Sequence, residues 1–322
     1  MTLRILLSAK ARQPLAADIA LLLAATPHTF VDVGEDADVA FVSRDVTGLS
    51  TKNAVLPDTQ RFYDAMLGAP SLRWVQAHSA GADRSIFVEL RQRGVTVTTA
   101  SGANASVVVQ TALAGILALA RQLPRLMDAQ RRKAWSPLVG SGLPRDLAGQ
   151  TAVIVGWGPI GQGLATLLQA LGLRVSVVRS SEAPVAQASE TVSFENIRQV
   201  LPRADWLVLA CPLSERTRGL IDEAALALLP PGAHLVNIAR GEVIREAALV
   251  DALVSGRLAG AYLDVFEREP LPQDSPLWTL PNVIATPHSA GQSDGNERRV
   301  SAIFLDNLSR WRDGQALLYV SS

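Results

Sequence analysis

The sequence contains one cysteine, Cys211, and no excess of charge of either sign. A single cysteine excludes a framework of disulfide bonds and fits a reducing compartment. The 30 lysines and arginines are balanced by 30 aspartates and glutamates, so the formal net charge is zero. Nucleic acids and anionic membranes bind proteins with a basic excess, and we therefore expect neither as a partner.

Long apolar runs are also missing. The amino-terminal run in MTLRILLSAK is short and is interrupted by Arg4, which favours a first strand over a secretory signal. The longest apolar stretch, Val107–Ala120, contains Gln110 and Thr111 and is too short to span a bilayer. We expect a cytoplasmic protein, with 322 residues arranged as two domains or one large one.

What the sequence does contain is a glycine-rich loop at GxGxxG spacing. The segment TAVIVGWGPIGQG combines an expected strand, Thr151–Val155, with Gly156, Gly158 and Gly161, and a helix is expected to begin near Pro159. In a dinucleotide site the first glycine allows the tight turn, the second lets the backbone approach the pyrophosphate, and the third lets helix and strand pack closely. The helix N-terminus favours phosphates. A glycine-rich turn without a ligand is the alternative, but a strand before and a helix after favour the dinucleotide site.

Short apolar runs alternate with helical patterns along the rest of the chain, which predicts parallel α/β sheets. The expected strands before residue 102 are Leu3–Ser8, Val39–Ser43, Leu72–Ala77 and Val95–Thr99, with helices at Pro14–Ala25 and Ser85–Arg93. Six more are expected after residue 150, as a doubly wound dinucleotide domain needs: Ala152–Val155, Val175–Val178, Trp206–Ala210, His234–Ile238, Gly260–Leu263 and Val283–Ala285. The apolar helical stretch Asn104–Lys133 lies between the two series, and Pro124 is expected to end or kink it. An amphipathic segment, Asn296–Trp311, follows the last strand.

The end of the second strand in the later series bears on the choice of cofactor. A site for NAD places Asp or Glu there to bind the ribose 2′-hydroxyl. This strand instead ends in Arg179 and Ser180, which could bind a 2′-phosphate. We predict a preference for NADP(H), with NAD(H) possible. The alternative is that Arg179 is a solvated charge and that Glu182 or a backbone group holds the ribose.

Four further motifs follow the glycine loop: CPLSERTRGLI at 211–221, VNIARGEVI at 236–244, GAYLDVFEREPL at 260–271 and PNVIATPHSAG at 281–291. In this order and spacing they resemble the motifs of the D-isomer-specific 2-hydroxyacid dehydrogenases, over most of residues 145–291. HSAGAD at 78–83 is a weaker match to the substrate loop of that family. The resemblance implies an α/β fold with two lobes. A Rossmann NAD(P)-binding domain, 102–290, is inserted into a flavodoxin-like substrate domain made of 1–101 and 291–322. It also implies a homodimer.

Reduction of a 2-oxo acid needs three things: a hydride, stabilisation of negative charge on the carbonyl oxygen, and a proton from a positioned acid. The planar fork of an arginine can hold carbonyl and carboxylate oxygens together, and histidine titrates near neutral pH. A neighbouring carboxylate stabilises a charged imidazole and orients it. The resemblance assigns these roles to Arg240 as the substrate-binding arginine, His288 as the acid/base and Glu269 as its partner.

The resemblance also implies the remaining contacts. Ser79, Ala80 and Gly81 form a turn whose N–H groups could bind the substrate carboxylate, together with Arg240 and His288. Asp264 resembles the residue that holds the nicotinamide carboxamide, or it is an acid at a strand-end turn. Cys211 is expected to lie against the cofactor rather than act as a nucleophile, and no metal is expected. The cofactor-binding residues are Gly156, Trp157, Gly158, Pro159, Ile160, Gly161, Arg179, Ser180, Cys211, Pro212, Thr217, Ile238, Ala239, Asp264 and Gly291.

Glyoxylate and hydroxypyruvate are the expected substrates, as in a glyoxylate or hydroxypyruvate reductase. Formate dehydrogenases of this superfamily pair the histidine with glutamine, so Glu269 argues against that activity. A phosphoglycerate dehydrogenase-like enzyme and a dinucleotide-sensing, corepressor-like binding protein of the same fold stay open. Trp135 could reach into the substrate pocket of a partner subunit, or it could simply pack.

Overall fold

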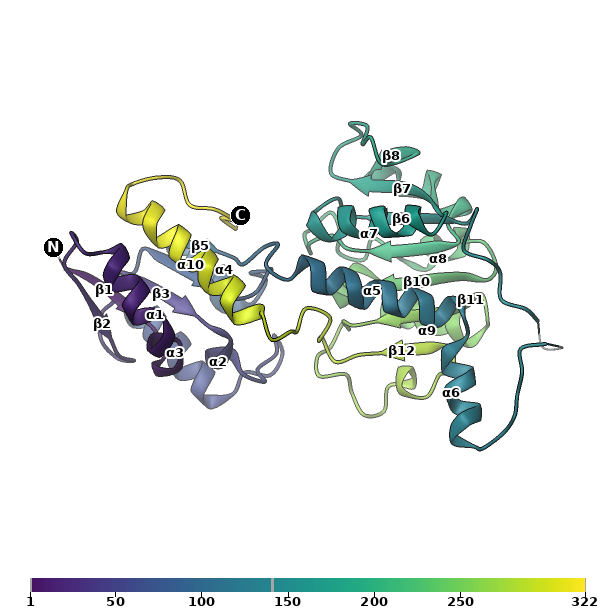
Figure 1. The fold of residues 1–322 in the computed structure, drawn as a ribbon, viewed down its shortest axis with the longest axis horizontal. Coiled ribbons are helices and arrows are strands. Elements are labelled where there is room, and N and C mark those ends of the chain that lie inside the picture. The colour runs from purple at the N-terminus through teal and green to yellow at the C-terminus, as the bar shows by residue number, and fades with distance from the viewer. Residues whose placement is uncertain (1, 140–141, 322) are drawn as a thin grey trace. The chain divides into compact units, whose positions relative to one another are not determined.

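The structure, a computed structural model, describes residues 2–139 and 142–321. Residues 1 and 322, the end points of the predicted substrate domain, lie outside the described residues. The chain divides into two units (Figure 1): unit 1 is Met1–Asn104 with Ser293–Ser322, and unit 2 is Ala105–Gln292. Each unit is built on its own sheet, and both sheets are parallel throughout, which confirms the predicted α/β class.

Unit 1 has a five-stranded parallel sheet in the order β2-β1-β3-β4-β5. Helices α1 and α10 pack on one face of this sheet, and α3 and α4 pack on the other. The carboxyl-terminal helix α10 belongs to this unit because Phe304 stacks on Phe41, with ring centroids 4.6 Å apart. Its elements are β1 (Leu3–Leu6), α1 (Ala9–Leu22), β2 (His28–Val31), β3 (Val39–Val42), α2 (Arg44–Thr47), α3 (Pro57–Gly68), β4 (Trp74–Ala77), α4 (Ser85–Gln92), β5 (Thr96–Thr98) and α10 (Asn296–Arg312).

The sequence prediction for unit 1 was incomplete. Strand β2 was not predicted, because its mixed polar residues lie at the edge of the sheet and only Val31 is buried. The first helix was expected to begin at Pro14 but begins at Ala9. Ser8 is its N-cap, since the Ser8 hydroxyl accepts a hydrogen bond of 3.0 Å from the backbone N–H of Ala11. Helix α3 was also not predicted.

Unit 2 has a seven-stranded parallel sheet in the order β12-β11-β10-β9-β6-β7-β8. All six predicted strands are present, and the seventh, β8, is a short edge strand that was not predicted. The chain winds outward from β6 to β8 and then continues on the other side of β6 with β9, so the order reverses between β6 and β9. The bounds are α5 (Ala105–Ala120), α6 (Leu123–Arg131), β6 (Thr151–Val155), α7 (Pro159–Ala170), β7 (Arg174–Arg179), β8 (Glu190–Ser193), η1 (Phe194–Gln199), η2 (Leu201–Arg203), β9 (Trp206–Leu209), α8 (Glu223–Leu228), β10 (Ala233–Asn237), η3 (Gly241–Val243), α9 (Glu246–Val254), β11 (Leu258–Leu263), η4 (Pro276–Trp278) and β12 (Val283–Ala285).

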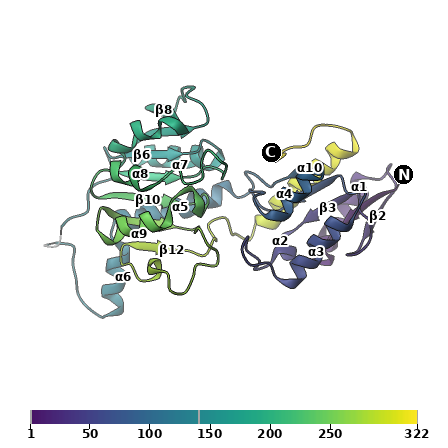
Figure 2. The ribbon, with the colours of Figure 1, turned by 180° about the vertical axis from the view of Figure 1, so that it is seen from behind.

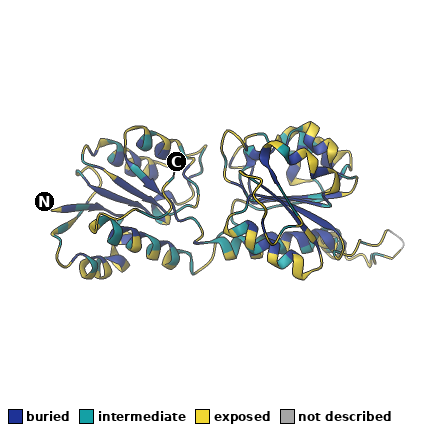
Figure 3. Cartoon of the chain, turned by 90° about the horizontal axis from the view of Figure 1, so that it is seen from above, coloured by how far each residue is buried: buried dark blue, intermediate teal, exposed yellow. Residues whose placement is uncertain are grey.

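Successive side chains of β6 point to opposite faces of the sheet, so they belong to two separate parts of the core of unit 2. Val153 and Val155 pack with residues of α8 and α9, whereas Ala152 and Ile154 pack with residues of α5 and α7. Figure 1 shows α5 and α7 on the near face of this sheet, and Figure 2 shows α8 and α9 from behind. The strands are buried on both sides (Figure 3), which explains why they are continuous apolar runs in the sequence.

The long helical stretch breaks just before Pro124, as predicted. Helices α5 and α6 are bent by 71° relative to each other. Gln122, between them, has a left-handed backbone with φ of 53°, and Pro124 stands in the first turn of α6. Among the described helices, none is by itself both long and apolar enough to cross a membrane, and the α5–α6 pair meets the criterion on length and composition only.

Candidate active site

Five residues singled out from the sequence each follow a strand of the sheet in unit 2. Gly156 follows β6, Cys211 follows β9, Arg240 follows β10, Asp264 follows β11 and His288 follows β12. Because all these strands are parallel, the residues that follow them gather at the carboxyl edge of the sheet. Ligands of open α/β sheets bind at this edge, where the strand order reverses.

The three glycines of the loop after β6 have different surroundings. Gly156 has φ of 107°, and a Cβ there would lie 2.6 Å from the carbonyl oxygen of Ala210. A Cβ on Gly161 would lie 2.1 Å from the oxygen of Gly156. Glycine at this position therefore lets the start of α7 pack closely against the turn. Gly158, at the N-cap of α7, has no atom within 4 Å of the Cβ position. The first and third glycines therefore shape the loop, and the second opens space at a helix N-terminus that fits a pyrophosphate.

His288 and Glu269 form a hydrogen-bonded pair beside this edge. Nδ1 of His288 lies 2.8 Å from Oε2 of Glu269. The Glu269 side chain is only 9% exposed, whereas that of His288 is 50% exposed. The backbone N–H of Phe266 donates to Oε1 of Glu269 at 3.2 Å. The buried carboxylate thus orients an imidazole whose other ring nitrogen, Nε2, has no hydrogen bond to any residue that the structure describes.

Asp264 holds the backbone that carries His288. Its carboxylate accepts hydrogen bonds from the Thr286 hydroxyl (2.7 Å) and from the N–H groups of Ser289 (2.8 Å) and Ala290 (2.9 Å). The N–H of His288 donates to the carbonyl of Asp264 at 2.8 Å. His288 has φ of 49°, uncommon for a residue with a side chain, and these bonds fix that conformation. Burial raises the pKa of Asp264, although the three donors oppose the rise. This positioning role was not predicted from the sequence.

Arg240 stands on a loop with little freedom. The amide of Asn237, buried at the end of β10, donates to the carbonyl of Arg240 at 3.0 Å and accepts from the N–H of Ala239 at 3.1 Å. Nη1 of Arg240 donates to the carbonyl of Ala239 at 2.7 Å. A Cβ on Gly241 would lie 1.8 Å from the backbone of Phe266, so only glycine fits after the arginine. This contact ties the arginine motif to the acidic motif after β11.

The loop after β9 is held by Thr217. Its hydroxyl donates to the carbonyl of Pro212 at 2.7 Å and accepts from the N–H of Ser214 at 2.8 Å, and Thr217 itself is buried. Burial raises the pKa of the Cys211 thiol to about 12, so the thiol is protonated at neutral pH. A protonated, buried thiol is a poor nucleophile, in line with a packing role.

The end of β7 presents a cation rather than an acid. The side chain of Arg179 has no hydrogen bond or ion pair with any residue that the structure describes. The carboxylate of Glu182 instead accepts hydrogen bonds from Ser193 and Asn196, and these bonds lower its pKa. Glu182, the alternative ribose ligand, is therefore already engaged with the β8–η1 segment.

The substrate loop of the sequence prediction lies in unit 1, at the carboxyl end of β4. The Ser79 hydroxyl donates to the carbonyl of Gly81 at 2.6 Å, and Ala80 between them is exposed. His78, just before this turn, bonds to the Thr47 hydroxyl at 2.9 Å. Burial and the nearby Arg44 and Arg84 lower the pKa of His78 to about 3, so its ring is neutral.

Two arginines beside this turn were not singled out in the sequence. Arg84 is fixed by the carbonyl of Ser50 (2.7 Å) and the Tyr63 hydroxyl (3.2 Å). The guanidinium of Arg44 has no partner among the described residues, and burial with the charge of Arg84 lowers its pKa. The turn thus stands in a positive environment suited to a carboxylate. A strand end followed by arginine in VSRD was the signal that could have identified Arg44.

The remaining predicted cofactor residues stand in the same loops. Trp157 and Ile160 are partly buried against the α5–α7 side of the core, and Pro159 begins α7. Ile238 and Ala239 are buried between β10 and Arg240. Gly291 follows Ala290, whose carbonyl accepts a hydrogen bond from Thr111 of α5 at 3.0 Å. No group of three or more His, Cys, Asp or Glu that could hold a metal ion occurs among the described residues.

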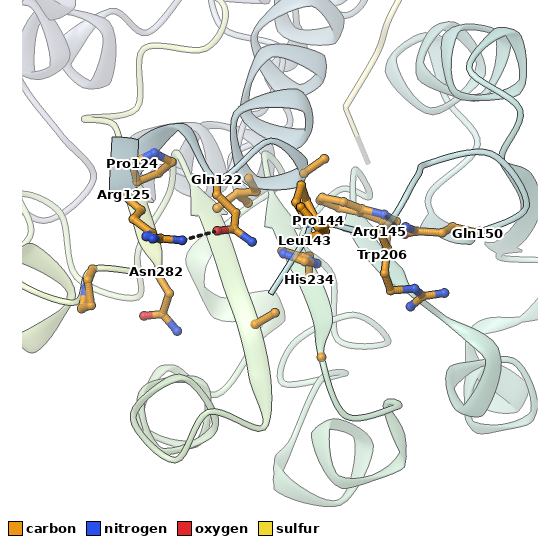
Figure 4. A pocket seen from close by; sticks show the side chains of 15 residues that line it. Gln122, Pro124, Arg125, Leu143, Pro144, Arg145, Gln150, Trp206, His234 and Asn282 are labelled. Atoms are coloured by element: carbon orange, nitrogen blue, oxygen red, sulfur yellow. Dashed lines mark hydrogen bonds between the residues drawn. The ribbon is translucent and has the colours of Figure 1, made fainter. Parts of the chain in front are cut away.

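One pocket, of about 360 Å³, lies at the opposite edge of the sheet in unit 2 (Figure 4). It is lined by residues at the amino ends of β9–β12, by the α5–α6 junction and by the segment around Arg145. There His234 stacks on Trp206 with ring centroids 4.3 Å apart, and burial lowers its pKa to about 4. None of the predicted site residues lines this pocket.

The chain is similar in sequence to known proteins over most of its length. Residues 113–290 match the family profile described as D-isomer specific 2-hydroxyacid dehydrogenase, NAD binding domain. A glyoxylate reductase of Thermococcus gammatolerans is 34% identical over 282 residues, which are 84% of this chain and 81% of that protein. A glyoxylate/hydroxypyruvate reductase B of Pectobacterium atrosepticum is 33% identical over 280 residues, which are 86% of this chain and 87% of that protein.

A solved structure shares the fold. The crystal structure of a D-isomer specific 2-hydroxyacid dehydrogenase from Xanthobacter autotrophicus Py2, in complex with NADPH and MES, is 27% identical to this chain. The two match with a TM-score of 0.78 over 99% of this chain and 98% of the other. The likeness therefore includes unit 1, which the family profile does not cover.

Proposed function

Since the chain belongs to the D-isomer specific 2-hydroxyacid dehydrogenase family, we propose that it reduces a small 2-oxo acid to the D-2-hydroxy acid, with NADPH as the hydride donor. Membership of the family makes it an NAD(P)-dependent oxidoreductase whose NAD-binding domain includes the seven-stranded sheet. The observation that carries the proposal is the hydrogen bond between His288 and the buried Glu269 at the carboxyl edge of that sheet.

In the proposed mechanism two side chains, those of Arg240 and His288, act on the substrate, and Glu269 acts through His288. Reduced nicotinamide, when bound, supplies the hydride to the keto carbon. The guanidinium of Arg240 binds the carbonyl and carboxylate oxygens and stabilises the charge that develops on the former. Nε2 of His288 donates a proton to the carbonyl oxygen, and Glu269 on Nδ1 stabilises the charged ring before that transfer. Asp264 keeps the His288 backbone in place.

The cofactor would be held by the loops at the same edge. The open space at Gly158 and the N–H groups at the start of α7 suit the pyrophosphate. Arg179 and Ser180 would bind the 2′-phosphate. This proposal is supported by the Arg179 side chain, which has no partner among the described residues, and by the engagement of Glu182 with Asn196. Asp264 has capacity for one further hydrogen bond, which the nicotinamide carboxamide could donate.

Glyoxylate and hydroxypyruvate are the proposed substrates, because the relatives named glyoxylate reductase and glyoxylate/hydroxypyruvate reductase B are about one third identical to this chain. The N–H groups of Ser79, Ala80 and Gly81 would receive the carboxylate, since none of them donates a hydrogen bond within the described chain. Arg44 would add positive charge beside them.

A panel of 2-oxo acids assayed with both cofactors tests the proposal. The panel contains glyoxylate, hydroxypyruvate, pyruvate and a phosphorylated hydroxypyruvate, and oxidation of NADPH or NADH is followed by absorbance. We expect turnover above about 1 s⁻¹ with NADPH and one of the first two acids. Dinucleotide binding without turnover of any acid would favour a corepressor-like binding protein. A higher kcat/KM with NADH would refute the cofactor assignment alone.

We further propose that the protein is a cytoplasmic homodimer whose contact includes α6 and the segment after it. Four apolar side chains there are largely exposed, and Trp135 at 97% cannot pack within its own chain. We expect Trp135→Ala to shift the dimer towards monomer in light scattering, with Trp278→Ala, 52% exposed, as the control. A wild-type monomer at all concentrations would contradict this assembly. Besides Trp135, the largely exposed apolar side chains of α6 and the segment after it are Met127, Val139 and Leu143.

A further inference from the structure

Arg216 brings a second guanidinium to the end of β7. It stands in the loop that follows β9, within the motif 211–221, and no role was expected for it from the sequence. Nη2 of Arg216 donates to the carbonyl of Ser180 at 3.3 Å. Ser180 follows Arg179 directly, so the loop after β9 brings the Arg216 guanidinium to the residue next to Arg179.

The guanidinium of Arg216 is held in a fixed orientation by Glu195. Nε and Nη2 of Arg216 each donate to a different carboxylate oxygen of Glu195, both at 2.9 Å. The guanidinium also lies over the ring of Phe194, 5.3 Å from the ring centroid. The pair lowers the pKa of Glu195 and raises that of Arg216. A planar fork that already binds two oxygens of one anion is shaped to bind two oxygens of a phosphate.

Another anion can replace the Glu195 carboxylate on Arg216, because this ion pair is exposed to solvent. The side chains are 47% and 60% exposed, and ion pairs this exposed contribute little to stability. The other nearby carboxylate, that of Glu182, is bound to Asn196 and Ser193. Two arginines and two glutamates therefore leave this corner electrically neutral, and a dianionic phosphate would be bound by releasing a glutamate from one arginine.

We propose that Arg216 is a second 2′-phosphate-binding residue, and that the phosphate of NADPH takes the place of the Glu195 carboxylate on its guanidinium. Arg179 and Arg216 then both bind the phosphate beside Ser180. Glu195 keeps the fork oriented when no phosphate is present and competes with it when one is. This inference rests on the proposed use of NADPH.

The test measures the affinities for 2′,5′-ADP and 5′-AMP, which differ only in the 2′-phosphate, by titration calorimetry on the intact protein. We expect Arg216→Ala to weaken 2′,5′-ADP binding by about 10-fold or more and to leave 5′-AMP within about 2-fold. Glu195→Gln removes the competing charge, so we expect it to tighten 2′,5′-ADP binding by about 2- to 5-fold. Arg198→Ala is the matched control, because Arg198 pairs with Asp222 (3.3 Å) and has no hydrogen bond or ion pair with Arg179 or Ser180 among the described residues, yet its loss changes the net charge equally.

Equal weakening of both nucleotides by Arg216→Ala would overturn the proposal, because Arg216 would then only support the Ser180 backbone. If the Glu195→Gln variant binds 2′,5′-ADP more weakly than wild type, the proposed competition between Glu195 and the phosphate is refuted. A wild-type protein that binds 2′,5′-ADP no more tightly than 5′-AMP would refute the use of NADPH itself. Failure of the NADPH assignment is thereby distinguished from failure of the role given to Arg216.

Discussion

Replacing Gly158 with alanine separates cofactor binding from folding, because this glycine stands in open space. Its backbone angles, φ −83° and ψ −173°, are ones that alanine adopts readily. The added methyl group meets no atom within 4 Å. Alanine restricts the unfolded chain but is a poorer N-cap than glycine, and these effects oppose each other. We expect the free energy of unfolding to change by less than about 1 kcal/mol.

The effect on binding follows from the same position. A methyl group at Gly158 would occupy the space through which a pyrophosphate approaches the N-terminus of α7. Loss of one hydrogen bond from a helix N–H to a phosphate oxygen removes about 1.5–3 kcal/mol. We therefore expect Kd for NADPH to rise about 10- to 150-fold.

The assay is quenching of tryptophan fluorescence by NADPH, since Trp157 adjoins the substituted residue, combined with thermal unfolding. Gly161→Ala is the contrasting variant. Its Cβ would lie 2.1 Å from the Gly156 oxygen, so we expect it to destabilise the fold by about 1–3 kcal/mol. A folded Gly158→Ala protein that binds NADPH within 2-fold of wild type would refute the reasoning about the pyrophosphate.

Three further variants test the catalytic groups. His288→Ala is expected to lower kcat by about 10²–10⁴-fold with little change in NADPH affinity, and turnover like that of wild type would remove His288 from the mechanism. Arg240→Lys is expected to lower kcat and raise KM, because an ammonium cannot hold two oxygens in a fork; a change in Tm alone would indicate a structural role. Glu269→Gln keeps an acceptor near Nδ1 but removes the negative charge that stabilises the protonated ring. The decline of kcat/KM for reduction with rising pH is therefore expected to begin at a lower pH, and an unchanged profile would count against the pair.

Strands buried on both faces were predictable, because their residues form short, continuous apolar runs in the sequence. Residues 151–155 and 206–209 are examples, and both stand near the centre of the sheet. The edge strands β2 and β8 were missed for the opposite reason. Solvent covers one side of an edge strand, so residues such as Thr29 and Glu190 interrupt the apolar pattern.

The candidate site was predictable where the resembled family assigns a role to each residue, and less so where a contact between loops has no such role. The pairing of His288 with Glu269 was expected from two motifs of the resembled family. The hydrogen bonds that Asp264 accepts from the loop that carries His288 were not expected, since a strand-end acid has many possible partners. The contact of Arg216 with Ser180 joins residues 36 positions apart, and nothing in the local sequence indicates it.

The place of α10 in unit 1 affects how the chain folds as it is synthesised. The apolar face formed by Ile5, Phe41 and Trp74 is covered by α10, whose residues follow the whole of unit 2 in the chain. At about 5–20 residues per second, a ribosome needs about 10–40 s to make the roughly 190 residues of that insertion. Until α10 has been made, the sheet of unit 1 lacks Phe304, whereas unit 2 can complete its own sheet once β12 has been made. Closure of the unit 1 core on its α10 side therefore has to wait for residues that follow the whole of unit 2 in the chain.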